Sequence, residues 1–399
     1  MIMRFSTLTY QTNAVAAMQD LQTALAKTQT QIASGKRLQS AADDPAAMAQ
    51  VNQLSVAVSA SQQYVTNGNA ASTSLKQEQQ ALTDATNALQ SARDLAVQAN
   101  SSTLSVSNRQ AIAAQLQQLQ QQIVSIANRT DANGNYLFSG YAAGTQPFAQ
   151  SGTSVAYVGA QGVSQIQISA NQSISSGDTG AAVFMNVPAG NGTFTTAVGP
   201  VNAGTGSIDP GSVRNPASWV PDTYTISFTS ATQYKVTNSG GTQVASGTYT
   251  SGASIAFNGV QVSISGVPAQ NDQFTVAPAG KASVFSTLGT LVTTLNAPGA
   301  SSGQIASQLA TGLQQIDNAL NNFNGVQASV GGRINAVSAS QSTAQSQQTT
   351  LQGTISQLSD LDYATAVTQL GREQISLQAA QQTYASLAKL GLFSYLSGL

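Results

Sequence analysis

The stretch SGKRLQSAADDPAAMA gathers the charged side chains that are most able to do chemistry, in a chain where only 7% of the 399 residues are charged. Four of them lie within nine positions: Lys36, Arg37, Asp43 and Asp44. Two bases and two acids at this spacing can form ion pairs, within the chain or with a neighbour. Acid followed by proline is typical of a helix start, because the carboxylate accepts free backbone N–H groups and proline needs no partner in the first turn. We therefore predict that the two aspartates begin a helix at Pro45.

Groups for catalysis are scarce. The chain has neither Cys nor His, which removes thiol nucleophiles, imidazole bases, disulfides and nearly all zinc or iron sites. A carboxylate pair for glycoside cleavage could come only from four scattered aspartates: Asp178, Asp209, Asp222 and Asp272. They are spread over about 95 residues among turn formers, where Asp is common. No serine has a His partner, and no phosphate-binding loop is present. We expect no enzyme, no cofactor and no metal.

The charge balance also limits the partners. A formal net charge of −1 gives no long-range field that could gather nucleic acid or an acidic membrane. The first residues lack the apolar core of a secretory signal, and no apolar run approaches the length of a membrane span. We therefore expect neither nucleic acid nor a membrane among the partners.

Helical periodicity dominates the N-terminal third. Residues 12–33 carry a seam with steps of four and three: Ala14, Met18, Leu21, Leu25, Thr28 and Ile32. Gly35 is a predicted helix stop. A second helix is predicted over residues 45–98, with a kink or a division into two shorter helices at TNGNA, residues 66–70. A third is indicated by Ile112, Leu116, Leu119, Ile123 and Ile126, and it is followed by an Asn133-Gly134 turn.

The sequence of the middle of the chain predicts β structure. Residues 147–280 hold 18 of the 34 glycines and show period-two strands such as YTISF at 224–228. In SIAFNGVQVSI, residues 254–264, Asn258-Gly259 is the pair that type I′ hairpin turns prefer. Helical seams return after this segment, at Ile305, Leu309, Leu313, Ile316, Leu320 and Phe323, then at Ile334, Val337, Ala344, Leu351, Ile355 and Leu358, and finally at Leu370, Leu377 and Tyr384.

The predicted fold is mainly α, with long N- and C-terminal helices paired as a coiled coil or bundle and a central all-β domain inserted between them. We place paired terminal segments at 1–42 and 359–399, the two halves of a helical rod at 43–146 and 281–358, and the β domain at 147–280. Several seam positions are glutamines, and a buried unpaired amide costs about 1–3 kcal/mol. A pairing of two helices alone would be marginal, and assembly of many subunits could complete it.

Four blocks make the chain similar to the flagellin family: SGKRLQSAADDPAAMA, RDLAVQAN, VGGRINAV (330–337) and SDLDYATAVTQLGREQISLQAAQQTYA (359–385). They resemble the family's terminal blocks in type, order and spacing, and together cover about 140 residues at each end. DANGNYLFSGY (131–141) and the ending LGLFSYLSGL resemble the hook-associated members more than flagellin. FNGVQVSISGVPAQNDQFTV is similar to a β module that recurs in hook-associated proteins.

The resemblance implies a structural subunit of the bacterial flagellum at the junction of hook and filament, which allows flagellin to assemble. Paired termini would line the inner wall of a tube, the first long helices would form the next shell, and the middle would project outward. Implied partners are copies of the chain in a ring, another hook-associated protein on the hook side and flagellin on the filament side. Similar proteins leave the cytoplasm unfolded through the flagellar type III export apparatus, after a cytoplasmic chaperone has held the C-terminal helix. The implied final location is therefore extracellular.

The resemblance also suggests a role for the four charges. In the family, the stretch similar to residues 34–44 joins the inner coiled coil to the outer helices and lies against neighbouring subunits. Lys36 and Arg37 beside Asp43 and Asp44 would then be complementary contacts between subunits, which fix register more than they add affinity. A solvated loop with a helix cap is the alternative for the aspartates, and the two interpretations are compatible. Further candidate contacts are Arg372, Phe393 and Tyr395.

Two other functions compete with the junction role. Flagellin, the filament subunit, shares the terminal blocks, but the LFSYL ending and NGNYLFSG weaken this reading. A secreted adhesin-like structural protein would use the β domain to bind a ligand, through an aromatic face formed by Trp219, Tyr224, Tyr234 and Tyr249. Aromatic residues at alternating strand positions more often belong to the core.

Overall fold

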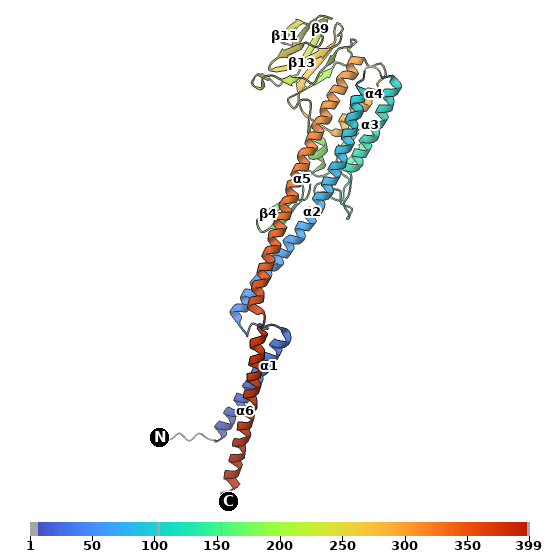
Figure 1. The fold of residues 1–399 in the computed structure, drawn as a ribbon. Coiled ribbons are helices and arrows are strands. Elements are labelled where there is room, and N and C mark those ends of the chain that lie inside the picture. Colours follow the sequence, from blue (N-terminus) through green and yellow to red (C-terminus); the bar gives the residue numbers. More distant parts are fainter. Residues whose placement is uncertain (1–6, 102–103, 153, 397–399) are drawn as a thin grey trace. The chain divides into compact units, whose positions relative to one another are not determined.

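The computed structural model describes residues 7–101, 104–152 and 154–396, with side chains described up to residue 386. The chain divides into two compact units: unit 1 is Met1–Val65 with Gln341–Leu399, and unit 2 is Thr66–Ser340. Figure 1 shows the helices, which are α1 (Thr7–Ser34), α2 (Pro45–Ala99), α3 (Val106–Ala127), α4 (Val284–Asn296), α5 (Ser302–Ser359) and α6 (Tyr363–Leu396). No helix within the described residues is both long and apolar enough to cross a membrane.

Unit 1 is built on the pairing of α1 with α6, which run along each other. Its buried apolar side chains, among those described, are Leu38, Val65, Ala344 and Ala366. Large apolar side chains stay in solvent on both partners, such as Tyr10 on α1 and Ile375 on α6, which are 62% and 70% exposed. Since buried apolar area is the main source of helix-pair stability, this pairing has little to hold it in the isolated chain.

The predicted division of the second helix is wrong, because α2 continues through Asn67, Gly68 and Asn69 without interruption. A glycine inside a helix costs only about 1 kcal/mol relative to alanine. The next turns bury Ala71 and Leu75 completely, and Asn67 donates a hydrogen bond to the carbonyl of Gln167. Packing on this side therefore outweighs the local preference for a break.

Unit 2 has a helical core in which α3 packs on α4 and the seams of α2 and α5 are buried. At its centre, the ring of Phe184 lies 5.2 to 5.8 Å from the rings of Phe138, Phe148, Phe285 and Phe323. All five rings are fully buried. α4 was not predicted as a separate helix, although its apolar residues recur at helical spacing and Ser283 caps it by accepting hydrogen bonds from the N–H groups of Phe285 and Ser286.

Short strands between residues 148 and 188 join this helical core instead of the main β sheets. They are β1 (Phe148–Ser151), β2 (Ser154–Tyr157), β3 (Gln165–Ser169), β4 (Gln172–Ser175) and β5 (Val187–Pro188), which pairs with β15 (Lys281–Ala282), and a π-helical turn lies at Ala181–Met185. β1 pairs with β2 and β3 pairs with β4. Their inward residues, such as Ile168 and Ile174, pack in one cluster with the helices.

The remaining strands form a separate β core. One sheet has the order β11-β10-β9-β14-β6, and the other has β12-β13-β7 with β8 also on β13. The strands are β6 (Phe194–Val198), β7 (Ser207–Ile208), β8 (Ser212–Val213), β9 (Tyr224–Ser230), β10 (Gln233–Thr237), β11 (Gln243–Thr248), β12 (Ser254–Phe257), β13 (Val260–Ser265) and β14 (Gln273–Pro278). A short 3₁₀ helix lies at Pro216–Ser218.

Two predictions for this region are confirmed. Asn258 and Gly259 have φ values of 40° and 78° and connect paired strands β12 and β13, as a type I′ turn requires. The aromatic residues proposed as a binding face belong to the core: Tyr224 is 1% exposed, and Trp219, Tyr234 and Tyr249 pack against the same cluster.

The predicted fold class is therefore confirmed: long terminal helices flank a central all-β domain. One helix boundary was not predicted, since α5 ends at Ser359 and α6 begins at Tyr363. Asp362 caps α6 by accepting hydrogen bonds from the N–H groups of Ala364 and Thr365. The aspartate before this helix start is the signal that could have located the break.

Candidate functional site

The charged stretch at 34–44 lies against a second connection within unit 1. We call the two connections the loop pair: residues 35–44 join α1 to α2, and residues 360–362 join α5 to α6. Lys36 and Asp360 form an antiparallel bridge between them. The Leu361 N–H donates to the Gly35 carbonyl (3.0 Å), and the Arg37 N–H donates to the Ser359 carbonyl (2.7 Å). Residues more than 320 positions apart are thus joined by their backbones.

Gly35 makes this approach possible. It ends α1 with a φ of 69°, a region that L-residues with a side chain adopt at a cost. A Cβ at this position would lie 2.9 Å from the hydroxyl oxygen of Tyr363, at the start of α6. The predicted helix stop is confirmed, and the structure adds a second reason for glycine, which is the closeness of α6.

The two bases serve the second connection. The Lys36 ammonium lies 2.5 Å from Oδ1 of Asp360, and the Arg37 guanidinium donates to the Leu358 carbonyl at 2.6 Å. A cation on the last carbonyls of α5 is favourable, because those groups carry the negative end of the helix dipole. Lys36, followed by the hydroxyl of Ser356, lowers the pKa of Asp360 below its ordinary value.

The two acids have different roles, so the prediction that both begin the helix is only half right. Asp44 does cap α2, because its carboxylate accepts the Ala47 N–H at 3.0 Å. Asp43 instead folds the connection back on itself: it accepts the N–H groups of Gln39 and Ser40 and pairs with Lys27 of α1 at 2.7 Å. Lys27 is the main reason that the pKa of Asp43 lies well below its ordinary value.

The candidate contact residues differ in what the structure shows of them. The side chains of Lys36, Arg37 and Asp44 are 50%, 47% and 39% exposed, and they remain open to a neighbour despite their internal pairs. Asp43 is only 15% exposed. Arg372 is exposed on α6, away from the loop pair in sequence. Phe393 and Tyr395 lie in α6 at positions whose side chains are outside the description.

Three residues were not predicted: Asp360 and Asp362 of the loop pair, and Lys27 of α1, which pairs with it. Lys27 and Asp360 act through partners that no local pattern reveals. Only Asp362 carried a readable signal, as an acid at a helix start.

The aspartates considered for catalysis do not form a pair. Asp272 accepts N–H groups from Ala203, Gly204 and Ala269, and Asp209 accepts those of Gly211 and Ser263. Asp222 accepts the N–H of the residue that follows it, and Asp178 pairs with an arginine. Within the described part of the chain, no group of three or more acidic residues could hold a metal ion.

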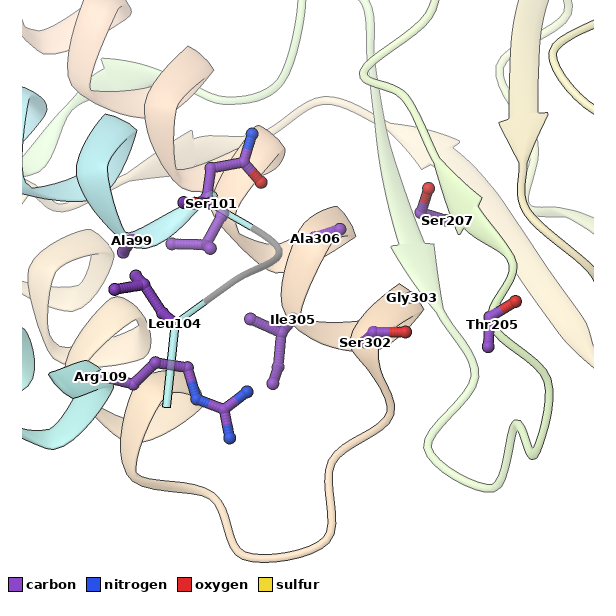
Figure 2. A pocket seen from close by; sticks show the side chains of 12 residues that line it. Ala99, Ser101, Leu104, Arg109, Thr205, Ser207, Ser302, Gly303, Ile305 and Ala306 are labelled. Carbon is purple, nitrogen blue, oxygen red and sulfur yellow. The ribbon is translucent and has the colours of Figure 1, made fainter. Parts of the chain in front are cut away.

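A cavity of about 230 Å³ in unit 2 is shown in Figure 2, where the end of α2 and the starts of α3 and α5 meet β7. Apolar side chains such as Leu104 and Ile305 line it, together with hydroxyl groups and Arg109, whose buried Nε has no hydrogen-bond partner. In this view Ile305 lies between the Arg109 guanidinium and the hydroxyl of Ser302. Polar and apolar groups line this cavity together, and Arg109 is the one charged side chain among the described residues that line it.

Comparison with known proteins gives three family matches along the chain. Residues 5–143 match the bacterial flagellin N-terminal helical region, and residues 313–396 match the bacterial flagellin C-terminal helical region. Residues 212–278, within the separate β core, match the D2-like domain of flagellar hook-associated protein 1.

Individual relatives agree with these matches. FlgL from Xanthomonas campestris is 32% identical, with a TM-score of 0.71 over 76% of this chain and 99% of that one. The flagellar junction protein FlgL from Legionella pneumophila is 33% identical, with a TM-score of 0.65 over 69% of this chain and 94% of that one. Flagellar hook-associated protein 3 from Escherichia coli is 27% identical over 186 residues, 46% of this chain, and the match spans only 58% of that curated relative.

Proposed function

Because this chain belongs to the flagellin family and is FlgL-like in sequence and fold, we propose that it is a structural subunit of the flagellum that joins hook to filament. The observation that carries the proposal is the likeness to Xanthomonas campestris FlgL, which extends over 99% of that chain. The subunit acts as a structural adaptor that lets flagellin assemble, and it is not an enzyme. The engagement of the four central aspartates with backbone N–H groups or an arginine supports this part of the proposal.

The proposed partners follow from the position of such a subunit. Copies of the chain form a ring, with another hook-associated protein on the hook side and flagellin on the filament side. The apolar side chains that α1 and α6 leave in solvent support a unit 1 that is completed by its neighbours. Before assembly, the chain resides in the cytoplasm with a chaperone on its C-terminal helix. It then leaves through the type III export apparatus and ends outside the cell.

The domain organisation is part of the same proposal. Residues 1–42 and 359–399 are the paired terminal domain, residues 43–146 and 281–358 form the rod, and residues 147–280 face outward. The hydrophobic core of the main sheets, residues 194–278, is separate from that of the helices and supports an outer part that is independent of the assembly contacts. The strands between residues 148 and 188 pack with the helices, so this support does not extend to them.

A deletion strain tests the function. Cells that lack the protein should make hooks without filaments and release unassembled flagellin into the medium, and expression of the intact chain should restore filaments. Normal filaments in the deletion strain would contradict the junction role. Purified protein should form no long fibres at concentrations where flagellin polymerises, and long fibres would favour the flagellin reading.

The loop pair is the proposed place of subunit contact, with Lys36, Arg37 and Asp44 facing a neighbour and Arg372, Phe393 and Tyr395 contributing from α6. Asp43, which is mostly buried and pairs with Lys27, would act by holding the shape of the connection. The pairing of Lys36 with Asp360 complicates a simple charge reversal, because Lys36→Glu would break an internal ion pair as well. A swap of both residues solves this problem.

The double variant Lys36→Asp/Asp360→Lys rebuilds the internal pair and reverses the charges that a neighbour meets. We expect normal export and helix content but release of flagellin, while the single variant Lys36→Asp should also expose the loop pair to protease. Normal filaments with the double variant would show that Lys36 acts only within its own chain.

A further inference from the structure

A buried charged cluster in unit 2 has no place in the proposed subunit contacts. Glu78 of α2 is 1% exposed, in a chain with only two glutamates. One of its carboxyl oxygens accepts the Asp178 N–H at 3.1 Å, and the other, Oε2, is buried without a hydrogen-bond partner. Arg333 of α5 pairs with the Asp178 carboxylate, donates to the Gly177 carbonyl at 3.1 Å and leaves its Nε unpartnered.

This cluster fastens a segment that we call the strap, residues 165–178, which comprises β3, β4 and the following turn. Its inward side chains, Ile168 and Ile174, are buried in the helical core. Its backbone carbonyls accept hydrogen bonds from both long helices: from Asn67 and Ser74 of α2, and from Arg333 and Ser340 of α5. The strap therefore ties α2 to α5, and the charged cluster lies at its C-terminal end.

The charge count of the cluster depends on one proton. With Glu78 ionised, two carboxylates share a single guanidinium, and Oε2 of the fully buried Glu78 is an anionic oxygen without a donor. Such an oxygen is costly, and a buried carboxyl group avoids the cost by taking up a proton. With Glu78 protonated, the remaining Asp178 and Arg333 charges cancel.

Among the described residues, no charge besides those of Asp178 and Arg333 acts on Glu78. Asp131, in the turn after α3, lines a cavity of about 140 Å³ with Ser74 and Gly177, but its carboxylate is engaged by the N–H groups of Asn133 and Asn135. On α2 itself, Lys76 is exposed. Asp178 on the strap and Arg333 on α5 are therefore the charged partners that decide the state of Glu78.

We infer that Glu78, Asp178 and Arg333 form a proton-dependent latch, which holds the strap across α2 and α5 while Glu78 is protonated and loosens it when Glu78 ionises. Ionisation places a negative charge on the helix beside the negative charge of Asp178 on the strap, so the repulsion acts across the contact that fastens the strap. Burial, followed by the charge of Asp178, raises the pKa of Glu78 to about 8.

The direction of the pH effect follows from linkage. The closed strap holds a proton on Glu78 that the open strap releases near the ordinary pKa of about 4.5. The latch is therefore fully effective at low pH. The equilibrium constant for opening should rise about tenfold per pH unit between about pH 4.5 and about pH 8, and it should level off above pH 8.

The two glutamates allow a direct titration. In the full chain with Glu373→Gln, ¹³C labelling of glutamate leaves a single side-chain carboxyl signal, that of Glu78. We expect its NMR midpoint near pH 8, and we expect Asp178→Asn to lower this midpoint by removing the neighbouring charge. A wild-type midpoint near 4.5 overturns the inference, and so does a midpoint that Asp178→Asn leaves unchanged.

Hydrogen exchange tests the strap itself. Between pH 5 and 9, opening of residues 165–178 in the wild type relative to Glu78→Gln should rise about tenfold per pH unit until the plateau, because the neutral amide cannot ionise. In the β9–β10 hairpin of the same molecule, the ratio of exchange between the wild type and Glu78→Gln should not change with pH. A strap ratio that stays constant over this range overturns the latch. If Glu78→Gln does not fold, the NMR titration with Asp178→Asn still decides between the two outcomes.

Discussion

Replacing Gly35 by alanine should open the loop pair, and two separate costs can be read from its surroundings. The positive φ of 69° costs an alanine about 1–2 kcal/mol. The new Cβ would also lie 2.9 Å from the Tyr363 hydroxyl oxygen, closer than side chains normally approach. Tyr363→Phe removes that oxygen, and the next ring atom lies 3.9 Å away, which is an ordinary contact.

A double-mutant cycle therefore separates backbone strain from the clash. Alone, Gly35→Ala should raise the opening of the loop pair by at least 5- to 30-fold, the factor for about 1–2 kcal/mol. In the Tyr363→Phe background, the effect should fall to the backbone cost. The assay is hydrogen exchange at Arg37 and Leu361, whose N–H groups bridge the two connections. Equal effects in both backgrounds would refute the clash, and no effect in either would refute the argument from φ.

Three further predictions concern other parts of the chain. Phe184→Ala should destabilise unit 2 by about 3–5 kcal/mol, since its ring is fully buried among four others, while Val201→Ala, 85% exposed, should change calorimetric melting little. Acidification should open the loop pair, because the lowered pKa values of Asp43 and Asp360 give stability that is present above the ordinary value of 3.8 and lost as the pH falls below it. Amide protection, taken relative to the intrinsic exchange rate at each pH, that stays constant between pH 5 and 2 would contradict this. Gly259→Ala should loosen the β12–β13 hairpin, because the turn needs a φ of 78° and a Cβ would overlap a neighbouring backbone carbonyl. Amide exchange in this hairpin as slow as in the wild type would contradict the prediction.

The local parts of the fold were predictable because their causes are local. Seams with steps of three and four located the long helices, Gly35 located the end of α1, and Asn258-Gly259 located a hairpin. Continuity through Gly68 was not predictable, because the packing of the residues that follow it decides the outcome. The short helix α4 was missed although its signal is local. Its buried apolar residues recur at helical spacing: Val284, Phe285, Leu288, Leu291, Val292 and Leu295.

Only the N-terminal half of the candidate site, residues 36–44, was predictable from the sequence. The charges of residues 36–44 stand out in the sequence, but Asp360 is 324 positions from Lys36 and its role depends on the meeting of two connections. Glu78 illustrates the same limit, because its partner Asp178 lies a hundred positions away and its burial results from the strap. Sequence patterns reveal a residue's own element, and the pairing of distant elements needs the structure.

The few charged residues of this chain serve mainly to join its segments to one another. Within the described residues, five of the six ion pairs join separate segments: Lys27–Asp43, Lys36–Asp360, Arg93–Asp317, Arg129–Asp84 and Arg333–Asp178. The sixth, Arg37–Asp44, lies within one connection. Exposed pairs of this kind add little stability, about 0–1 kcal/mol each, so stability is not their main contribution. A shift of α2 against α5 would displace the buried apolar seams of both helices and also separate Arg93 from Asp317, so this ion pair reinforces the register that apolar packing selects.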